Sequence, residues 1–160
     1  MSENAREEKL RAAWARAKFI LEPRYTPTKF LGMDKMSVVV TAVHQTLGTE
    51  VAIKLLDENL LTDDEAKARF VREAKIAASI KHPNIVPVRD VNDQEGYIVM
   101  DRIHSVSLRE KIRKSKHLEA SKVIALARVI LSALNATHKE GVIHRDIKPA
   151  NILMEPNGHI

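Results

Sequence analysis

Residues 141–160 read GVIHRDIKPANILMEPNGHI. Two apolar pairs, Val142–Ile143 and Ile152–Leu153, enclose four side chains that can carry charge or bind a metal ion. These four are Arg145, Asp146, Lys148 and Asn151. Such a concentration of polar groups between apolar pairs is a candidate site for chemistry, and the rest of the chain indicates what kind.

Length and composition favour a folded protein. At 160 residues, the chain is long enough for one domain, or for one domain and part of another. It has 44% hydrophobic and 29% charged residues and no cysteine, which excludes disulfides and thiolate metal sites and suits a reducing cytosol. No apolar run approaches the roughly 20 residues of a membrane helix, and the N-terminus MSENAREEKL is too polar for a signal peptide. We therefore expect a soluble, cytoplasmic chain without a membrane span.

The net charge of +5 does not indicate nucleic-acid binding. Acidic residues lie between the basic ones along the whole chain, and no basic stretch carries the aromatic side chains that stack bases. The seven histidines do not fall at metal-site spacing, so we interpret them as structural or surface residues.

The first segment, residues 1–23, is predicted to be an amphipathic helix over 4–22 that ends at Pro23. One helical face carries Leu10, Trp14, Ala17 and Leu21. The helix could bind a partner, or Trp14 could dock on the domain that follows, and we favour docking.

The second segment, residues 24–101, changes to strands after Tyr25. The β-branched runs MSVVVTAV (36–43) and EVAIKLL (50–56) predict an antiparallel hairpin, and NIVPVRD (84–90) and YIVMD (97–101) predict two more strands. Between them, Thr62 with Glu65 resembles a capping box that opens a helix with Ala66, Phe70, Ala74 and Ala77 on one face. With a further strand from Tyr25, the five strands and one helix indicate an α+β fold.

The third segment, residues 102–160, is predicted to be mainly helical. Ser107 with Glu110 opens a short helix, and residues 121–139 form a longer one that Gly141 caps in the left-handed conformation. One stripe along the longer helix consists of Val123, Ala127, Ile130, Leu134 and His138.

Four motifs then occur in the order typical of one family: VAIK (51–54), FVREAKIAASIKHPNIV (70–86), YIVMD (97–101) and HRDIKPANIL (144–153). Taken alone, VAIK is only a strand that ends in a surface lysine, but the spacing within HRDIKPANIL is far more specific. Residues 25–160 resemble the eukaryotic-like (bacterial-type) serine/threonine protein kinases. The resemblance implies a kinase N-lobe, with a five-stranded antiparallel sheet and one helix, followed by a partial helical C-lobe.

The resemblance also implies roles in phosphoryl transfer from ATP to protein Ser/Thr hydroxyls. Asp146 would accept the proton of the substrate hydroxyl, Lys148 would steady the transferring group, and Asn151 would hold Mg²⁺. Arg145 would meet a phosphate on the activation segment, and we expect His144 to be a packing residue. The two apolar pairs would anchor this turn in the core.

For the nucleotide, Lys54 would reach the α and β phosphates and Glu73 would pair with Lys54. Without the family pattern, Glu73 would be interpreted as a helix-surface partner of nearby charges. Lys54, Glu73, Asp146 and Asn151 would converge on one cleft. The remaining expected ATP contacts are Leu31, Gly32, Val39, Ala52, the gatekeeper Met100, the backbones of Asp101 and Ile103, and Leu153.

The loop over the phosphates departs from the family pattern Gly-x-Gly-x-x-Gly. Gly32 remains, but Asp34 and Ser37 replace the other two glycines. A carboxylate that points at the phosphates from ~6 Å would cost roughly 1–3 kcal/mol of binding, whereas Lys35 or an outward turn of Asp34 would offset this cost.

The sequence contains no Asp-Phe-Gly motif, whose Asp is the principal Mg²⁺ ligand of the family. Asn151 alone cannot hold Mg²⁺. We therefore expect a kinase domain truncated before this motif and inactive alone, with part of helix 121–139 bare or covered by a partner. The alternatives are a pseudokinase module that binds a nucleotide or a partner without catalysis, and the product of a shortened reading frame without a settled function.

Overall fold

The computed structural model describes residues 3–34, 36–115, 117–144 and 146–160. It divides into two compact units, the first formed by residues up to Ala78 with Val88–Arg102, and the second by Ser79–Pro87 with Ile103–Ile160. The elements of the sheet-containing part are α1 (Glu3–Leu21), β1 (Tyr25–Met33), β2 (Ser37–His44), β3 (Glu50–Leu56), the 3-10 turn η1 (Glu58–Leu60), α2 (Asp64–Ser79), β4 (Val88–Asn92) and β5 (Tyr97–Asp101). Those that follow are β6 (Val106–Ser107), α3 (Leu108–Ser115), α4 (Ala120–Lys139), the 3-10 turn η2 (Pro149–Asn151) and β7 (Leu153–Met154).

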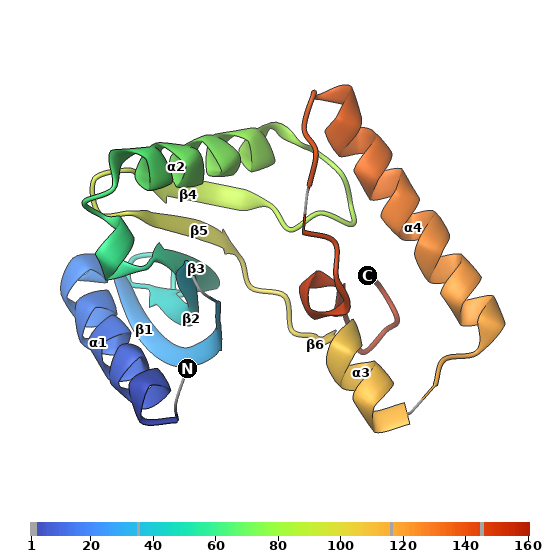
Figure 1. Ribbon diagram of the computed structural model, residues 1–160, viewed down its shortest axis with the longest axis horizontal. Coiled ribbons are helices and arrows are strands. Elements are labelled where there is room, and N and C mark those ends of the chain that lie inside the picture. Colours follow the sequence, from blue (N-terminus) through green and yellow to red (C-terminus); the bar gives the residue numbers. More distant parts are fainter. Residues whose placement is uncertain (1–2, 35, 116, 145) are drawn as a thin grey trace. The chain divides into compact units, whose positions relative to one another are not determined.

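The described part of the first unit contains a five-stranded sheet in the order β1-β2-β3-β5-β4, and every neighbouring pair is antiparallel. Side chains alternate between its two faces because successive residues of a strand point to opposite sides. Val40, Ile53 and Val99 belong to the core cluster that includes α1, whereas Leu56 and Ile98 belong to the cluster that includes α2. The two helices therefore cover opposite faces (Figure 1), and the predicted kinase-like α+β sheet is confirmed.

Helix α1 docks on the sheet of its own unit. Ala17 and Leu21 are fully buried against the strands, and the Trp14 ring lies 4.9 Å, centroid to centroid, from the Phe30 ring of β1. This confirms the docking interpretation of Trp14. The large apolar area of the two aromatic rings fixes the helix on the outer strand.

Helix α2 begins one residue later than the capping box predicts. The Asp63 carboxylate accepts the backbone N–H of Ala66 at 3.0 Å, and the Asp63 carbonyl accepts that of Lys67. Asp63, and not Thr62, is therefore the N-cap, since an aspartate caps a helix as well as a threonine does. The predicted apolar face is correct, because Ala66, Phe70 and Ala74 are buried.

In the second unit, α3 opens with the predicted reciprocal capping box. The Ser107 N–H donates to the Glu110 carboxylate at 3.0 Å, and the Glu110 N–H donates to the Ser107 hydroxyl at 3.2 Å. These bonds also lower the pKa of the Glu110 carboxyl, the backbone bond contributing most. The charged form of Glu110 thus stabilises the start of the helix.

The apolar stripe identified on α4 is not the face that the helix buries. Leu126 and Thr137 are the buried residues, whereas Val123, Ala127 and His138 are exposed. Leu131 is 64% exposed, which agrees with the expectation that part of this helix is bare. The periodicity of an apolar helix is the same for several adjacent stripes, so packing decides which one is buried.

By length and composition alone, α4 could also cross a membrane. This is weak evidence for a span, because the core helix of a soluble domain passes the same test. The absence of a membrane span stays a prediction.

Candidate active site

The second unit brings together the three predicted catalytic side chains. Lys148 Nζ lies 2.8 Å from Asp146 Oδ2, and Asn151 Nδ2 donates to the same oxygen at 2.8 Å and to the Asp146 carbonyl at 2.9 Å. One carboxylate oxygen thus receives both a cation and an amide. The arrangement forms within six residues, since η2 turns the chain back between Lys148 and Asn151.

This carboxylate is exposed yet firmly ionised. The hydrogen bond from Lys148 lowers the pKa of the Asp146 carboxyl most, and the bond from Asn151 lowers it further. Asp146 therefore carries its charge at neutral pH and can accept a hydrogen bond from a hydroxyl group.

The supports of this turn differ from the predicted ones. Ile143 is 66% exposed, so the first apolar pair does not anchor the turn in a core. The second pair does contribute, because the Ile152 carbonyl accepts the N–H of Leu108 at 2.8 Å and Leu153 pairs with Ser107 between β6 and β7. His144 is exposed and its Nδ1 accepts the Asp146 N–H at 3.3 Å, so it is not the expected packing residue. Arg145 and Lys35 lie outside the described residues.

The described donor set does not form a metal site by itself. No group of three or more His, Asp or Glu side chains that could hold a metal occurs in the described ranges. Asn151 uses its amide nitrogen on Asp146, which leaves the neutral amide oxygen for a cation, whereas Mg²⁺ prefers at least one carboxylate. The assignment of Asn151 as a metal ligand stays a prediction.

The first unit places four predicted nucleotide contacts on one face of the sheet. Val39 lies opposite Lys54, and Ala52 lies opposite Met100, in adjacent antiparallel pairs. Leu56 lies two residues from Lys54, and Ile98 lies two residues from Met100, so each pair shares a face of the sheet. Leu56 and Ile98 pack in the cluster that includes α2. This face therefore presents small and apolar side chains together with one lysine.

The ion pair predicted between Lys54 and Glu73 is absent from the described structure. Lys54 Nζ lies 5.8 Å from the centroid of the Phe70 ring, within the range of a cation–π contact, and Glu73 is exposed. Phe70 precedes Glu73 by three residues on α2, so the ammonium group meets the apolar side of the helix instead. The sequence did not predict the contact between Lys54 and Phe70, because Phe70 was expected only to pack in the core.

The other predicted nucleotide residues fall in both units. Leu31 is 40% exposed, and nothing lies within 4 Å of a Cβ placed on Gly32, so the backbone there is open to approach. Asp101 binds Arg89 through two bonds of 2.5 and 2.7 Å that occupy its carboxylate. Ile103 and Leu153 are half-buried residues of the second unit. The convergence of all these residues on one cleft stays a prediction.

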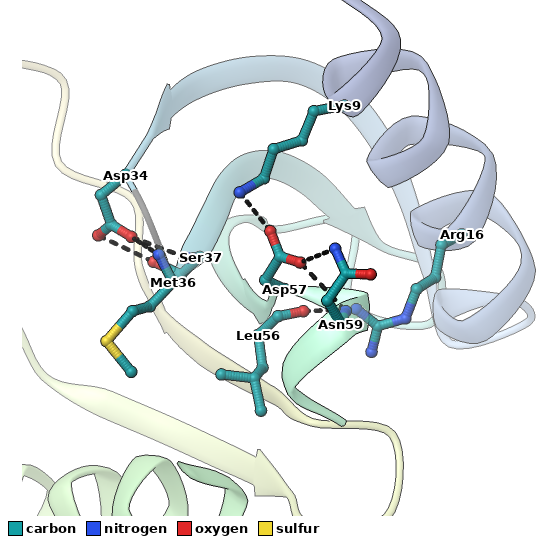
Figure 2. Close-up of polar contacts among 8 residues, drawn as sticks. All are labelled: Lys9, Arg16, Asp34, Met36, Ser37, Leu56, Asp57 and Asn59. Atoms are coloured by element: carbon teal, nitrogen blue, oxygen red, sulfur yellow. Dashed lines mark hydrogen bonds and ion pairs between the residues drawn. The ribbon is translucent and has the colours of Figure 1, made fainter. Parts of the chain in front are cut away.

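Asp34 turns its carboxylate onto its own loop. Asp34 Oδ1 accepts the N–H groups of Met36 and Ser37, each at 2.7 Å, and Oδ2 accepts the Ser37 hydroxyl at 3.0 Å (Figure 2). Ser37 is 1% exposed, so its polar groups depend on this carboxylate. Asp34 and Ser37, which stand where the family pattern has its second and third glycines, therefore bind each other and fix the turn together. We call Asp34, Met36 and Ser37 the β1–β2 turn.

Three comparisons bear on this arrangement. The protein kinase domain family matches residues 25–160. The chain is 37% identical to the serine/threonine-protein kinase PrkC of Bacillus subtilis, over 86% of this chain and 22% of PrkC. It is 36% identical to the serine/threonine-protein kinase PknB of Mycolicibacterium smegmatis, over 88% of this chain and 23% of PknB.

A crystal structure of the PknI kinase domain of Mycobacterium tuberculosis superposes with a TM-score of 0.72 and 30% identity. The match covers 82% of this chain and 54% of that domain chain. The chain thus spans under a quarter of these two curated relatives and about half of a solved kinase domain. From the motifs, the sheet, the catalytic turn and these matches, we conclude that the chain belongs to the protein kinase domain family, among the bacterial serine/threonine kinases.

Proposed function

We propose that the protein with these 160 residues transfers the γ-phosphate of ATP, taken up as its Mg²⁺ complex, to serine or threonine hydroxyls of a protein substrate. One observation carries the proposal, namely the contact of Lys148 and Asn151 with the same oxygen of Asp146. Family membership supports the reaction class. We propose a cytoplasmic location on the composition described above.

Asp146 accepts the hydrogen bond of the substrate hydroxyl and orients its oxygen for attack. Because Lys148 and Asn151 lower the pKa of this carboxyl, Asp146 is a weak base. It therefore takes the proton of the substrate hydroxyl late in the reaction, which suits a loose transition state. Lys148 supplies positive charge beside the reacting oxygen. Asn151 would help to hold the Mg²⁺ that ATP brings, and that ion would supply further charge neutralisation at the phosphates.

We also propose that the 160-residue chain by itself lacks transfer activity. Its described residues contain no group of three or more acidic or histidine side chains that could hold a metal ion, and the metal complex of ATP needs a firmer hold for in-line transfer. Ile143 and Leu131 are exposed apolar side chains of the second unit, which favours a partner or a further segment that covers them.

The second candidate is a module that binds a nucleotide or a partner without catalysis. The observation that favours it is the β1–β2 turn, because Asp34 already satisfies the N–H groups of Met36 and Ser37. A loop whose N–H groups bind an internal carboxylate has fewer donors for the phosphates.

The test combines an Mg²⁺-dependent thermal shift with ATP and a γ-phosphate transfer assay on a generic basic protein. We expect a shift of the melting temperature with ATP and no transfer by the 160-residue chain. Transfer that Asp146→Asn abolishes, and that the exposed control Asp93→Asn retains, would show that the chain alone is active. Absence of any ATP-dependent shift would refute nucleotide binding in both candidates.

A further inference from the structure

Helix α1 precedes the residues that match the kinase family, yet its charged side chains reach the end of β3. Lys9 forms an ion pair with the Asp57 carboxylate, which is only 7% exposed. Arg16 Nη1 donates to the Leu56 carbonyl at 2.6 Å, and Arg16 Nη2 donates to the Glu95 carbonyl. Two cations on one helix face, seven residues apart, therefore bind the same junction.

Asp57 connects this junction to the β1–β2 turn. The Asp57 N–H donates to the Met36 carbonyl at 2.7 Å, and the Met36 N–H donates to Asp34 Oδ1 at 2.7 Å. Figure 2 shows the two ends of this sequence of contacts, Lys9 with Asp57 and Asp34 with Met36 and Ser37, and the Asp57–Met36 backbone bond connects them. The Lys9–Asp57 and Asp57–Met36 contacts join residues that lie far apart in the sequence, whereas the Met36–Asp34 contact lies within the turn.

The Asp57 side chain is held from two sides. Burial opposes its charge, but hydrogen bonds from Lys9 and from the backbone and side chain of Asn59 outweigh burial, so the pKa of the carboxyl lies below its ordinary value. An ionised, nearly buried carboxylate is costly without its cation. Loss of Lys9 would therefore shift Asp57 toward water and move the backbone that bonds Met36.

We propose that α1 is a positioning element for the β1–β2 turn, and that Lys9, acting through Asp57 and Met36, sets the affinity of that turn for the phosphates of the nucleotide. The proposal rests on the proposed function for the role of the turn in ATP binding. Lys9 and Asp57 are positioning residues, because neither touches the expected nucleotide contacts.

The experiment compares Lys9→Met with Lys9→Arg and with Lys18→Met in the full 160-residue chain. Lys9→Arg keeps the charge, and Lys18→Met removes an exposed cation from the same helix. Two quantities are measured, namely amide hydrogen exchange at Asp57, Met36 and Ser37, and the affinities for ATP and for adenosine.

Lys9→Met should speed exchange at these amides by roughly three- to tenfold, the effect of losing one ordinary hydrogen bond, and leave the core amide of Ile53 unchanged. The same variant should weaken ATP binding about as much and leave adenosine binding unchanged, because adenosine lacks the phosphates. Lys9→Arg should restore both quantities, and Lys18→Met should alter neither.

Unchanged exchange in Lys9→Met, or equal changes in Lys18→Met, would overturn the proposal. Equal weakening of ATP and adenosine would also overturn it, since the effect would then not act through the phosphates. A parent chain that binds neither ligand would refute the proposed function instead, and the exchange data would still decide whether Lys9 positions the turn.

Discussion

Asp34→Ala is expected to destabilise the first unit through the β1–β2 turn. The substitution removes one acceptor from the Met36 N–H, one from the Ser37 N–H and one from the Ser37 hydroxyl. Met36 is 41% exposed, so its N–H regains a hydrogen bond from water at little cost. Ser37 is 1% exposed, so its two donors stay unpaired unless the turn opens.

The magnitude follows from this difference in burial. A buried donor left without an acceptor costs about 1–3 kcal/mol, and opening the turn limits the total, so we expect a loss of about 2 kcal/mol in the free energy of unfolding. Asp34→Asn keeps one acceptor oxygen and should cost about 1 kcal/mol or less. Asp93→Ala, in the turn between β4 and β5, is the control because its exposed side chain forms no hydrogen bond or ion pair with the described residues.

The assay is urea denaturation followed by the fluorescence of Trp14, the single tryptophan of the sequence, which contacts β1 through Phe30. The midpoint should fall in the order Asp93→Ala, Asp34→Asn, Asp34→Ala. An Asp34→Ala midpoint equal to that of the control would refute the view that the carboxylate holds the turn.

Three further outcomes are expected. Gly96→Ala should destabilise more than Gly48→Ala in urea denaturation: both glycines have positive φ, but only at Gly96 would the new Cβ lie 2.7 Å from a leucine methyl group. Equal losses would contradict this steric argument. Asp57 should contribute stability above its ordinary pKa of 3.8 and lose that contribution as the pH falls through its lower folded-state value. Acid titration of unfolding should therefore show a smaller decrease below about pH 4 in Asp57→Asn than in the parent chain, and identical profiles would argue against the ion pair. Ser107→Ala should cost about 1 kcal/mol by loss of the α3 cap, measured by denaturation of the second unit, whereas Ser115→Ala at the other end of α3 should cost little.

The sequence predicted those features whose contacts close within a few residues. The β-branched runs formed the expected antiparallel pair of β2 and β3, and the Ser107–Glu110 box formed as expected. The catalytic turn also belongs to this class, because Asp146 meets its two partners within five positions. Local hydrogen bonds depend on spacing and residue type, and both can be read from the chain.

The predictions that the structure corrected concern positions where two or more neighbouring residues could have filled the same role. Asp63 replaced Thr62 as the cap of α2, and α4 buried Leu126, which lies outside the apolar stripe identified in the sequence. Lys54 contacted Phe70 and left Glu73 exposed. In each case neighbouring positions had similar propensity, and packing against other elements decided between them.

By itself, then, the sequence determined the helices, the family, the local contacts of the Asp146 turn and most strands, although the strand predicted over 84–90 runs over Val88–Asn92. Only the tertiary structure decided that Lys9 would meet Asp57, 48 positions away, and that the Asp57 backbone would hold Met36. The physical reason is that such contacts exist only after α1 has buried its apolar face on the sheet. No spacing along the chain encodes which charges that docking brings together.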